Sequence, residues 1–580
     1  MGTPTRLWSA LLAGVLLSSA LLPGLASAEP APQVSLDPKV KMHPLLQYGA
    51  QADPLASERV IVQMTKADVK PRDIAARVPG LRIDEDFDVL PAFVASVPHN
   101  TLPLLASLPS VRYVSPDGAV QVISNAAPGK DKHLAKPKAP RAVKSKKHID
   151  STRLVTTFPF DTRATDAWSG QIDGHAITGS EIAVAVIDSG IDPNHPDLAG
   201  QVLAINVNRH SSSAEDGYGH GTHVAGVING HDAALQYLGI APNATLISVK
   251  IADDDGTAFE SDLLRGLNWV YLYGDSYKIK ALNLSVSVAI PESYATSPVN
   301  AAVERLWNSD VTVVASAGNL GDAQDAVWYA PGNDPYVITV GCLDDNGTVA
   351  PGDDSLCPIS SRGVTEDGFA KPDLVAPGRK ILSALASGVA GEEPALAAEF
   401  PDRVTKDGHI RLSGTSMAAP MVTGAVALLL QRKGDLTPGQ IKQILTSTAM
   451  SYPGQLDRAG ALNIAAALAA AEHPSAPKVY VPVPSSGVMP PRDTQALLWD
   501  GARWGNAYFD GARWGNAYFD GARWGAAEWD GARWGAAYWD GARWGAAYWN
   551  GARWGNSSFD GARWGNSRFD GARWGNGTWD

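Results

Sequence analysis

The sequence predicts an α/β protein built on a mostly parallel central sheet, and two observations carry this prediction. Between residues 160 and 470, strand-like runs alternate with helix-like runs, which is the order expected of parallel strands joined by crossover helices. The strand-like runs are almost continuously apolar, as in "EIAVAVID" at 181–188, because helices cover both faces of such a sheet. A small α+β unit precedes this region, and a tryptophan- and glycine-rich repeat tail follows it.

The same patterns predict the individual elements of the α/β region. Further strands are expected at 244–251, 279–288, 311–319 and 336–343, and helices at 220–230, 259–273 and 297–308. A buried helix is expected at 417–430, where the sequence is small and apolar. The stretch "TPGQ" at 437–440 predicts another helix start, because its threonine, proline and glutamine fit a capping box.

Composition excludes some classes of partner. The chain has 580 residues, a formal net charge of −12 and 45% hydrophobic residues. An acidic surface gains nothing from nucleic acid or an anionic membrane, so neither is expected as a partner. Beyond the N-terminal segment, no stretch has the roughly 18 uncharged apolar residues that span a bilayer, so the mature protein is expected to lack a transmembrane anchor.

The N-terminus predicts export. Residues 1–28 combine Arg6, an apolar run and the small residues "ASA" before the end, which is typical of a cleaved signal peptide. An uncleaved membrane anchor is the alternative. We therefore expect a secreted, extracellular protein, in which Cys342 and Cys357 form a disulfide or remain two buried thiols.

The rest of the chain divides into six segments. They are an N-terminal spacer at 29–57, a compact unit at 58–124, a basic linker at 125–159, the α/β region at 160–470, a proline-rich linker at 471–498 and decapeptide repeats at 499–580. In the compact unit we expect strands at 58–64, 90–98 and 111–123, and a helix at 101–108 with Asn100 as its cap.

Three polar stretches fall where predicted strands end or helices begin. Asp188 ends the strand at 181–188, His220 lies between glycines at a helix start, and Ser416 precedes the buried helix. Each has a plainer interpretation: Asp188 as a turn residue, Ser416 as a helix cap, and His220 with His223 as a metal pair. Together they supply a nucleophilic hydroxyl, an imidazole base and a carboxylate that orients the imidazole.

The three motifs around these residues resemble the active-site signatures of subtilisin-like serine peptidases. They are "AVIDSGID", "GHGTHVAG" and "SGTSMAAP", in the family's order, and the resemblance covers roughly residues 160–470. It implies a subtilisin-like three-layer fold and hydrolysis of peptide bonds in protein substrates through an acyl-enzyme on Ser416. Asp188 would orient the imidazole of His220, which acts as general base and then as general acid. No cofactor is needed for this chemistry.

The resemblance also implies further site residues. Asn319, in "ASAGN", would donate to the oxyanion, although a strand-end turn residue is the plainer interpretation. The substrate backbone would bind as an added strand along an exposed edge at 282–287. The substrate-binding residues would be Leu284, Ser285, Val286, Ser316, Ala317 and Gly318. Ser287 departs from the family, which usually has glycine there, and its side chain would either narrow the adjoining pocket or point outward.

A structural calcium ion is a further implication. Asp197, in "HPDL", matches a position that often ligates calcium in this family. The partner loop at 229–242 lacks the expected asparagine and has Ala233 in its approximate place. The acidic stretch at 252–256 is either an alternative calcium site or a solvated turn.

The two flanking units also carry expectations. The compact unit at 58–124 resembles the propeptide of such enzymes, which implies an intramolecular chaperone and inhibitor cut off near 123–127; a permanent N-terminal domain is the alternative. In the tail, "GARWG" occurs eight times at ten-residue intervals from Gly501, which predicts a β-solenoid or stacked hairpins, with disorder as the alternative. Its aromatic residues suit binding to a cell surface or carbohydrate.

Two other functions fit parts of the sequence. One is a surface-binding protein defined by its repeats, with a vestigial hydrolase region. The other is a metallohydrolase built on His220 and His223.

Overall fold

The structure is a computed structural model that describes residues 41–122, 149, 151–172, 175–350, 352–453, 455 and 459–472, together with the strand backbones of the repeats between 497 and 579. The predicted signal peptide, most of the spacer, the expected cut near 123–127 and most of both linkers lie outside the described residues. Within the described residues, every helix is too short or too polar to cross a membrane.

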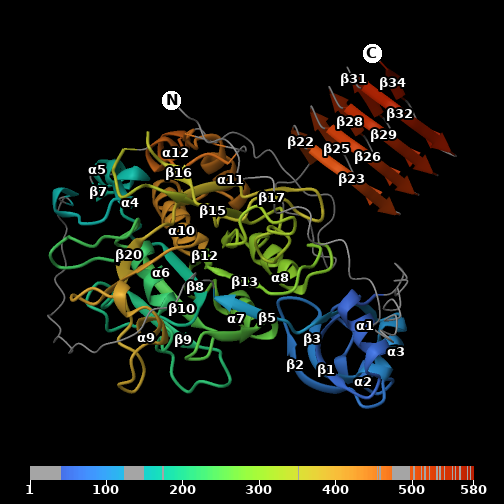
Figure 1. The fold of residues 1–580 in the computed structure, drawn as a ribbon, viewed down its shortest axis with the longest axis horizontal. Coiled ribbons are helices and arrows are strands. Elements are labelled where there is room, and N and C mark those ends of the chain that lie inside the picture. Colours follow the sequence, from blue (N-terminus) through green and yellow to red (C-terminus); the bar gives the residue numbers. More distant parts are fainter. Residues whose placement is uncertain are drawn as a thin grey trace, which may run out of the picture. The chain divides into compact units, whose positions relative to one another are not determined.

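Residues 41–122 form a small unit around a four-stranded antiparallel sheet (Figure 1). Its strands, in the spatial order β2-β3-β1-β4, are β1 (Ser57–Met64), β2 (Arg82–Phe87), β3 (Ala92–Pro98) and β4 (Val111–Pro116). Its helices are α1 (Pro44–Ala52), α2 (Pro71–Ala75) and α3 (Leu102–Ser107), with a 3-10 turn at His99–Thr101.

Most elements expected in this unit are present. The strand expected at 111–123 is divided into β4 and β5 (Ala119–Val122), and β5 does not join the four-stranded sheet. The other exceptions are local. The segment expected to be a spacer contains α1, whose first turn is capped by the His43 ring accepting from Leu45 N–H at 3.2 Å. Asn100 is not the cap of α3, because Thr101 occupies that position and makes no capping bond with its side chain.

The α/β region is built on an eight-stranded sheet that is parallel apart from one edge pairing. Its strands are β8 (Ala183–Asp188), β9 (Val202–Asn206), β10 (Thr245–Lys250), β12 (Ile279–Leu284), β14 (Thr312–Ser316), β15 (Ile338–Asp344), β16 (Ser355–Leu356) and β19 (Leu374–Pro377). The order is β16-β15-β14-β12-β8-β10-β9, and β19 also pairs with β15. Only β16 runs antiparallel to its neighbour. The predicted mostly parallel sheet is therefore confirmed.

The longer helices of the described α/β region lie around this sheet. They are α6 (His220–Asn229), α7 (Glu260–Tyr273), α8 (Pro298–Trp307), α10 (Thr415–Arg432), α11 (Pro438–Ser447) and α12 (Ile464–Ala470). The capping box predicted at the start of α11 is present, since Thr437 N–H donates to the Gln440 side chain and Gln440 N–H donates to the Thr437 hydroxyl.

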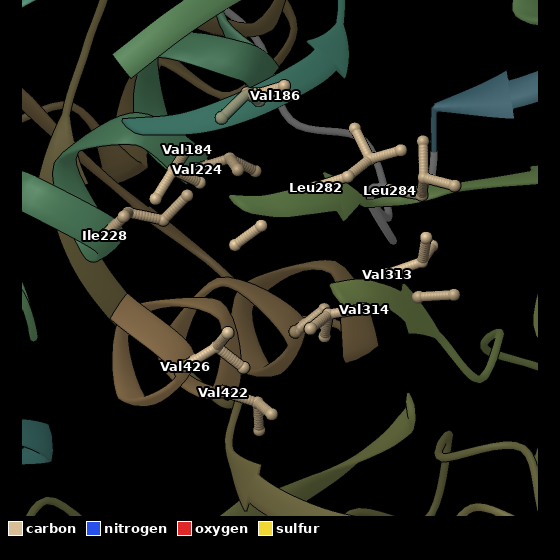
Figure 2. Close-up of a cluster of buried hydrophobic side chains, with 14 of the residues drawn as sticks. Val184, Val186, Val224, Ile228, Leu282, Leu284, Val313, Val314, Val422 and Val426 are labelled. Atoms are coloured by element: carbon tan, nitrogen blue, oxygen red, sulfur yellow. The ribbon is translucent and has the colours of Figure 1, made fainter. Parts of the chain in front are cut away.

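The core lies between the sheet and the two helices that carry the candidate catalytic residues. All six residues of β8 are buried, and α10 packs against α6 and against β12, β14 and β15. Figure 2 shows side chains from β8, β12, β14, α6 and α10 meeting here: Val184, Val186, Val224, Ile228, Leu282, Leu284, Val313, Val314, Val422 and Val426. A close-packed core of this kind fixes the strand ends and helix starts that border it.

Shorter elements complete the α/β region. The helices are α4 (Phe158–Asp161), α5 (Ala164–Ser169) and α9 (Ala395–Glu399), with 3-10 turns at Ser151–Arg153 and Pro401–Arg403. The short strands are β6 (Gln171–Ile172), β7 (His175–Ala176), β11 (Thr257–Phe259), β13 (Val286–Val288), β17 (Gly363–Val364), β18 (Ala370–Lys371), β20 (Ile381–Ala384) and β21 (His409–Leu412). A disulfide joins Cys342 to Cys357, whose Cα atoms are 5.4 Å apart.

The repeats form three sheets in which all neighbouring strands are parallel. One contains β22 (Leu497–Asp500), β25 (Ala517–Asp520), β28 (Ala537–Asp540), β31 (Ser557–Asp560) and β34 (Gly577–Trp579). The second contains β23 (Arg503–Asp510), β26 (Arg523–Asp530), β29 (Arg543–Asn550) and β32 (Arg563–Asp570). The third contains β24 (Arg513–Trp514), β27 (Arg533–Trp534), β30 (Arg553–Trp554) and β33 (Arg573–Trp574).

Pairing in the tail repeats every two decapeptides. Arg503 pairs with Arg523 and Arg513 pairs with Arg533, so each strand meets the strand twenty positions further along. Parallel pairing at this period is that of a solenoid and not of stacked hairpins, whose strands would be antiparallel. The identical decapeptides 501–510 and 511–520 contribute to different sheets, the first through β23 and the second through β24 and β25.

Candidate active site

The parallel sheet brings several candidate residues to one edge. In the order β14-β12-β8, Ala315 pairs with Leu284 and Asn283 pairs with Val186. Asp188 is the last residue of β8, Ser285 follows β12, and Asn319 lies just beyond β14. These positions share the carboxyl ends of neighbouring parallel strands, which is where ligand sites of such sheets form.

Asp188 and His220 form a buried hydrogen-bonded pair. The Nδ1 atom of His220 lies 2.8 Å from Oδ1 of Asp188, and the two residues are 0% and 1% exposed. The same carboxylate oxygen accepts the Ser189 N–H at 2.7 Å. The Nε2 atom of His220 is buried and has no hydrogen-bond partner among the described residues. The imidazole is thus held by one nitrogen, and the other is free to exchange a proton.

Ser416 lies in the first turn of α10 and is not its cap. The N-cap residue is Gly414, whose φ of 155° a glycine adopts readily. The Ser416 hydroxyl instead donates to the carbonyl of Ser285 at 3.2 Å, and the Ser285 hydroxyl donates back to the carbonyl of Ser416 at 2.9 Å. This exchange holds the hydroxyl at the sheet edge, beside the positive end of an 18-residue helix.

The side-chain amide of Asn319 is hydrogen-bonded through its oxygen but not through its nitrogen. Its Oδ1 accepts the Thr415 N–H at 3.0 Å and the Thr415 hydroxyl at 3.2 Å. Its Nδ2 is buried with no acceptor among the described residues. A buried amide donor without a partner is costly, so its persistence is typical of a group that is satisfied only when a ligand arrives.

A buried carboxylate that sequence reasoning missed fixes the His220 helix to the Asp188 turn. Asp216 accepts the Gly219 N–H at 2.7 Å and the Thr222 N–H at 2.9 Å, which are the unpaired donors at the start of α6. It also accepts the Ser189 hydroxyl at 2.9 Å, and that hydroxyl accepts the Gly221 N–H at 3.0 Å. An aspartate shortly before a helix start was the available signal.

Replacing Asp216 with asparagine is expected to lower kcat about 10- to 100-fold with little change in KM. An amide would turn one acceptor into a donor that faces N–H and O–H groups, and His220 would shift; misplacement by about 1 Å is enough for a loss of this size. Peptide-hydrolysis kinetics measure the effect, with Asp255→Asn in the exposed turn at 252–256 as the matched control. An equal loss in both variants, or a change confined to KM, would contradict this role.

The residues expected to bind substrate border these groups. Leu284 ends β12, Val286 starts β13, and Ser316 ends β14. Gly318 has φ +99°, and its N–H donates to the Thr415 hydroxyl at 3.1 Å. Ala317 N–H donates to the Val340 carbonyl at 3.0 Å.

The edge strand β13 is already paired. It binds β5 (Ala119–Val122) of the N-terminal unit, which also pairs antiparallel with β11 on its other side. Ser287, where the family usually has glycine, is half-buried opposite Gln121, and its hydroxyl bonds the Val288 carbonyl at 3.2 Å.

The geometry gives no support to a metal pair at His220 and His223. His223 is fully buried, its Nε2 lies 3.0 Å from the Ile381 carbonyl, and burial lowers its pKa to about 3. Within the described part of the chain, no three histidine, cysteine or acidic side chains are grouped so that they could hold a metal ion.

Asp197 does not fit a calcium ligand. Its carboxylate lies 2.8 Å from Nε2 of His409, and both residues are buried. Hydrogen bonds and charge from Asp197, together with Asp407, outweigh burial and raise the pKa of His409. The ring of Tyr237, from the loop that would have supplied a calcium ligand, stacks on His409 with centroids 3.7 Å apart. The Asp197 carboxylate is thus already paired with a histidine side chain.

The acidic stretch at 252–256 is a turn. Asp255 caps it by accepting the Thr257 N–H at 3.0 Å, and Asp254 pairs with the buried Lys250 at 2.9 Å. The Lys250 ammonium also donates to the Ser189 carbonyl at 2.9 Å, so this turn supports the residue next to Asp188.

Comparisons with known proteins find serine proteases among the relatives of this chain. Serine protease AprX of Bacillus subtilis (strain 168) is 35% identical over 298 residues, covering 49% of this chain and 64% of AprX. A subtilisin of Bacillus pumilus is 33% identical over 274 residues, covering 47% of this chain and 85% of that protein. An extracellular serine proteinase of Thermus sp. (strain Rt41A) is 29% identical over 452 residues, covering 76% of this chain and 93% of that protein.

A solved structure and a family model extend the comparison. Fervidolysin from Fervidobacterium pennivorans, described as a keratinolytic enzyme related to subtilisin, matches with a TM-score of 0.52 over 72% of this chain and 61% of that one. At 24% identity, this match shows the fold alone. The chain matches less than two thirds of AprX. The model described as the subtilase family matches residues 179–469, half of the chain, and we conclude that this chain belongs to the subtilase family.

Proposed function

We propose that this protein is a secreted serine endopeptidase that hydrolyses peptide bonds through an acyl-enzyme on Ser416. One observation carries the proposal: a buried imidazole is hydrogen-bonded to Asp188 through Nδ1, while its Nε2 and the nearby Asn319 amide are buried donors or acceptors without partners among the described residues. An arrangement with these two unsatisfied groups suits a reacting hydroxyl and a developing oxyanion.

The mechanism follows from these positions. His220 Nε2 takes the proton of the Ser416 hydroxyl as that oxygen attacks the scissile carbonyl, which requires the hydroxyl to turn from the Ser285 carbonyl. Asp188 holds the ring in the tautomer with hydrogen on Nδ1 and stabilises the imidazolium. Asn319 Nδ2 donates to the oxyanion, and His220 then gives its proton to the leaving amine. A water molecule then attacks the acyl-enzyme while His220 Nε2 takes its proton. His220 returns this proton to the Ser416 oxygen as the acid is released.

Export and self-processing belong to the same proposal. The relative from Thermus is named an extracellular proteinase, and the first 28 residues have the pattern of a signal peptide. The N-terminal unit at 58–124 acts as an inhibitor: β5 lies as an added strand between β11 and β13, the mode in which extended peptides bind an exposed edge. The segment that follows β5 in the sequence would then be the first peptide that the active site cleaves.

Contacts across this interface are extensive and polar. The Asp117 carboxylate accepts the Ser261 N–H and hydroxyl, both at 2.8 Å, at the start of α7. The Asn268 side chain accepts the N–H groups of Asp88 and Val89, both at 2.8 Å. The N-terminal unit and α7 thus satisfy each other's polar groups. These contacts support a role for this unit in the folding of α7 before the unit is released.

Release of the N-terminal unit is expected to speed up as pH rises. Burial raises the pKa of Glu292 to about 8, and burial with repulsion from Glu292 and Asp117 raises the pKa of Glu260 well above its usual range. The cations near these interface carboxylates are Arg59 and Arg265. Arg59 pairs with Asp117 at 3.2 Å, and Arg265 pairs with Asp262 and Glu85. Groups whose pKa is raised in the complex favour the complex when protonated. Affinity therefore falls as pH rises above about 4.5, and the part of this loss that comes from Glu292 is complete once pH passes about 8.

The test follows activation by pH. Purified full-length protein is incubated at several pH values, and aliquots are assayed at one common pH so that only release varies. Glu292→Gln, which stays neutral, is expected to slow release near pH 8 and to flatten its pH dependence. Faster release in acid, or an unchanged profile in Glu292→Gln, would contradict this account.

The repeats are proposed to bind a cell surface or carbohydrate. Their in-register parallel pairing stacks each tryptophan position of one coil on the same position of the next, as Trp504 on Trp524. A regular array of aromatic residues on a nearly charge-balanced scaffold suits a repetitive, polar ligand.

A further inference from the structure

Aspartates gather around the loop that the Cys342–Cys357 disulfide closes. Four lie within it, and the fifth is the last residue of α4, nearly two hundred positions earlier: Asp344, Asp345, Asp353, Asp354 and Asp161. The loop contacts α4 where the Thr157 hydroxyl donates to Asp345 at 2.5 Å, and Asp354 lies close enough to Asp161 to raise the pKa of that carboxyl.

Two of these aspartates are buried without a counter-charge. Asp354 is 1% exposed and Asp161 is 3% exposed. Both carboxylate oxygens of Asp354, and Oδ1 of Asp161, have no hydrogen-bond donor among the described residues. Burying an ionised carboxylate without a partner is strongly unfavourable. A bound cation or a proton is therefore needed to neutralise Asp161 and Asp354.

The remaining aspartates do not supply what is missing. Asp344 pairs with Arg379, Asp345 accepts the Thr157 hydroxyl at 2.5 Å, and Asp353 accepts the Thr348 hydroxyl at 2.9 Å. In the described ranges, no lysine, arginine or histidine forms an ion pair with Asp161 or Asp354. Burial, repulsion from Asp354 and Asp345, and a hydrogen bond with the Asp354 carboxyl raise the pKa of Asp161 to about 8. A protonated Asp161 could therefore donate to Asp354 when no cation is bound.

We propose that Asp161 and Asp354 ligate a structural calcium ion that joins the disulfide-closed loop to α4. Calcium binds six to eight oxygens in flexible geometry, and two carboxylates neutralise its charge. Since no third acidic or histidine side chain joins them within the described residues, main-chain carbonyls, hydroxyls and water complete the set. Zinc would need histidine or cysteine ligands, and magnesium a stricter octahedron.

Calcium has one rival here, a proton shared between the two carboxyls. The two explanations differ in what stabilises the loop. A calcium site makes stability depend on calcium concentration, because binding to the folded state alone shifts unfolding by mass action. A shared proton makes stability indifferent to calcium.

The test uses the full chain with Ser416→Ala, so that self-digestion does not interfere. Calcium is expected to raise its melting temperature by several degrees above the value in chelator, and calorimetric titration should show binding. Asp161→Asn and Asp354→Asn are each expected to be at least as stable as the parent in chelator, because an unpaired charge is gone, and to lose the response to calcium. Asp255→Asn, in an exposed acidic turn, should keep it.

Two results would overturn the proposal. One is a parent whose melting temperature and calorimetric titration do not respond to calcium, which would assign the pair a shared proton. The other is a calcium response that persists unchanged in both Asp161→Asn and Asp354→Asn. Should either variant fail to fold, the titration of the parent still decides between calcium and a proton.

Discussion

Replacing Ser416 with alanine is expected to lower kcat/KM for peptide hydrolysis by about six orders of magnitude, an order of loss that applies to a subtilisin. The Ser416 hydroxyl donates to the Ser285 carbonyl at 3.2 Å, and its removal should leave the packing of α10 almost intact. The folded protein should therefore keep its melting temperature within a few degrees while its chemistry disappears.

The same variant should also fail to mature. If the N-terminal unit is removed by the protein's own active site, Ser416→Ala should keep the mass of the chain that begins after signal removal, and wild type should lose roughly the first hundred residues more. Intact-mass measurement over time distinguishes the two. Ser413→Ala, three residues earlier, is the matched control: the Ser413 hydroxyl accepts the Lys380 N–H at 2.9 Å, and this variant should mature normally. Maturation of Ser416→Ala at the wild-type rate would contradict the account.

Replacing Asn319 with alanine is expected to lower kcat about 10²–10³-fold and to leave KM nearly unchanged. That range is the one that holds for the corresponding donor of a subtilisin, and the structure gives a reason for it to apply here. Thr415 occupies the amide oxygen through its N–H at 3.0 Å and its hydroxyl at 3.2 Å, so Nδ2 is the end left for the oxyanion. A donor used only after the carbonyl becomes tetrahedral affects turnover and not ground-state binding.

Thr415→Val sharpens this test. It removes the hydroxyl and keeps the N–H that holds the Asn319 oxygen, so its loss of kcat should be clearly smaller than that of Asn319→Ala. Asn243→Ala, whose amide donates to the Thr178 hydroxyl at 2.8 Å, serves as a control for the loss of a structural asparagine. If Asn319→Ala raised KM and left kcat unchanged, the side chain would be binding substrate and not the oxyanion.

The parts of this picture that depend on local sequence were predictable. Strand and helix periodicity gave β8, α6 and α10 within a few residues, and a polar residue at the end of an apolar strand or the start of a helix marked Asp188, His220 and Ser416. Local chemistry also predicted the capping box at Thr437. These features need only neighbours in the chain.

What the sequence did not predict depends on partners far apart in the chain. The His409 side chain reaches Asp197, 212 positions away, and no local pattern marks that pairing. In the sequence, Asp216 cannot be distinguished from other loop aspartates. Its role depends on the Ser189 hydroxyl, which the fold brings within hydrogen-bond distance. In the tail, two identical decapeptides contribute strands to different sheets, which no local pattern can distinguish. These features depend on tertiary packing and not on local propensity.

The most direct test of the central claim is to label the processed protein with a fluorophosphonate probe and locate the adduct by peptide mass. The account predicts a single adduct on Ser416 in wild type and almost none in His220→Ala, because the hydroxyl is reactive only when the imidazole held by Asp188 accepts its proton. Labelling of Ser416 that is unaffected by His220→Ala, or hydrolysis of peptides by a protein with no adduct on Ser416, would contradict it.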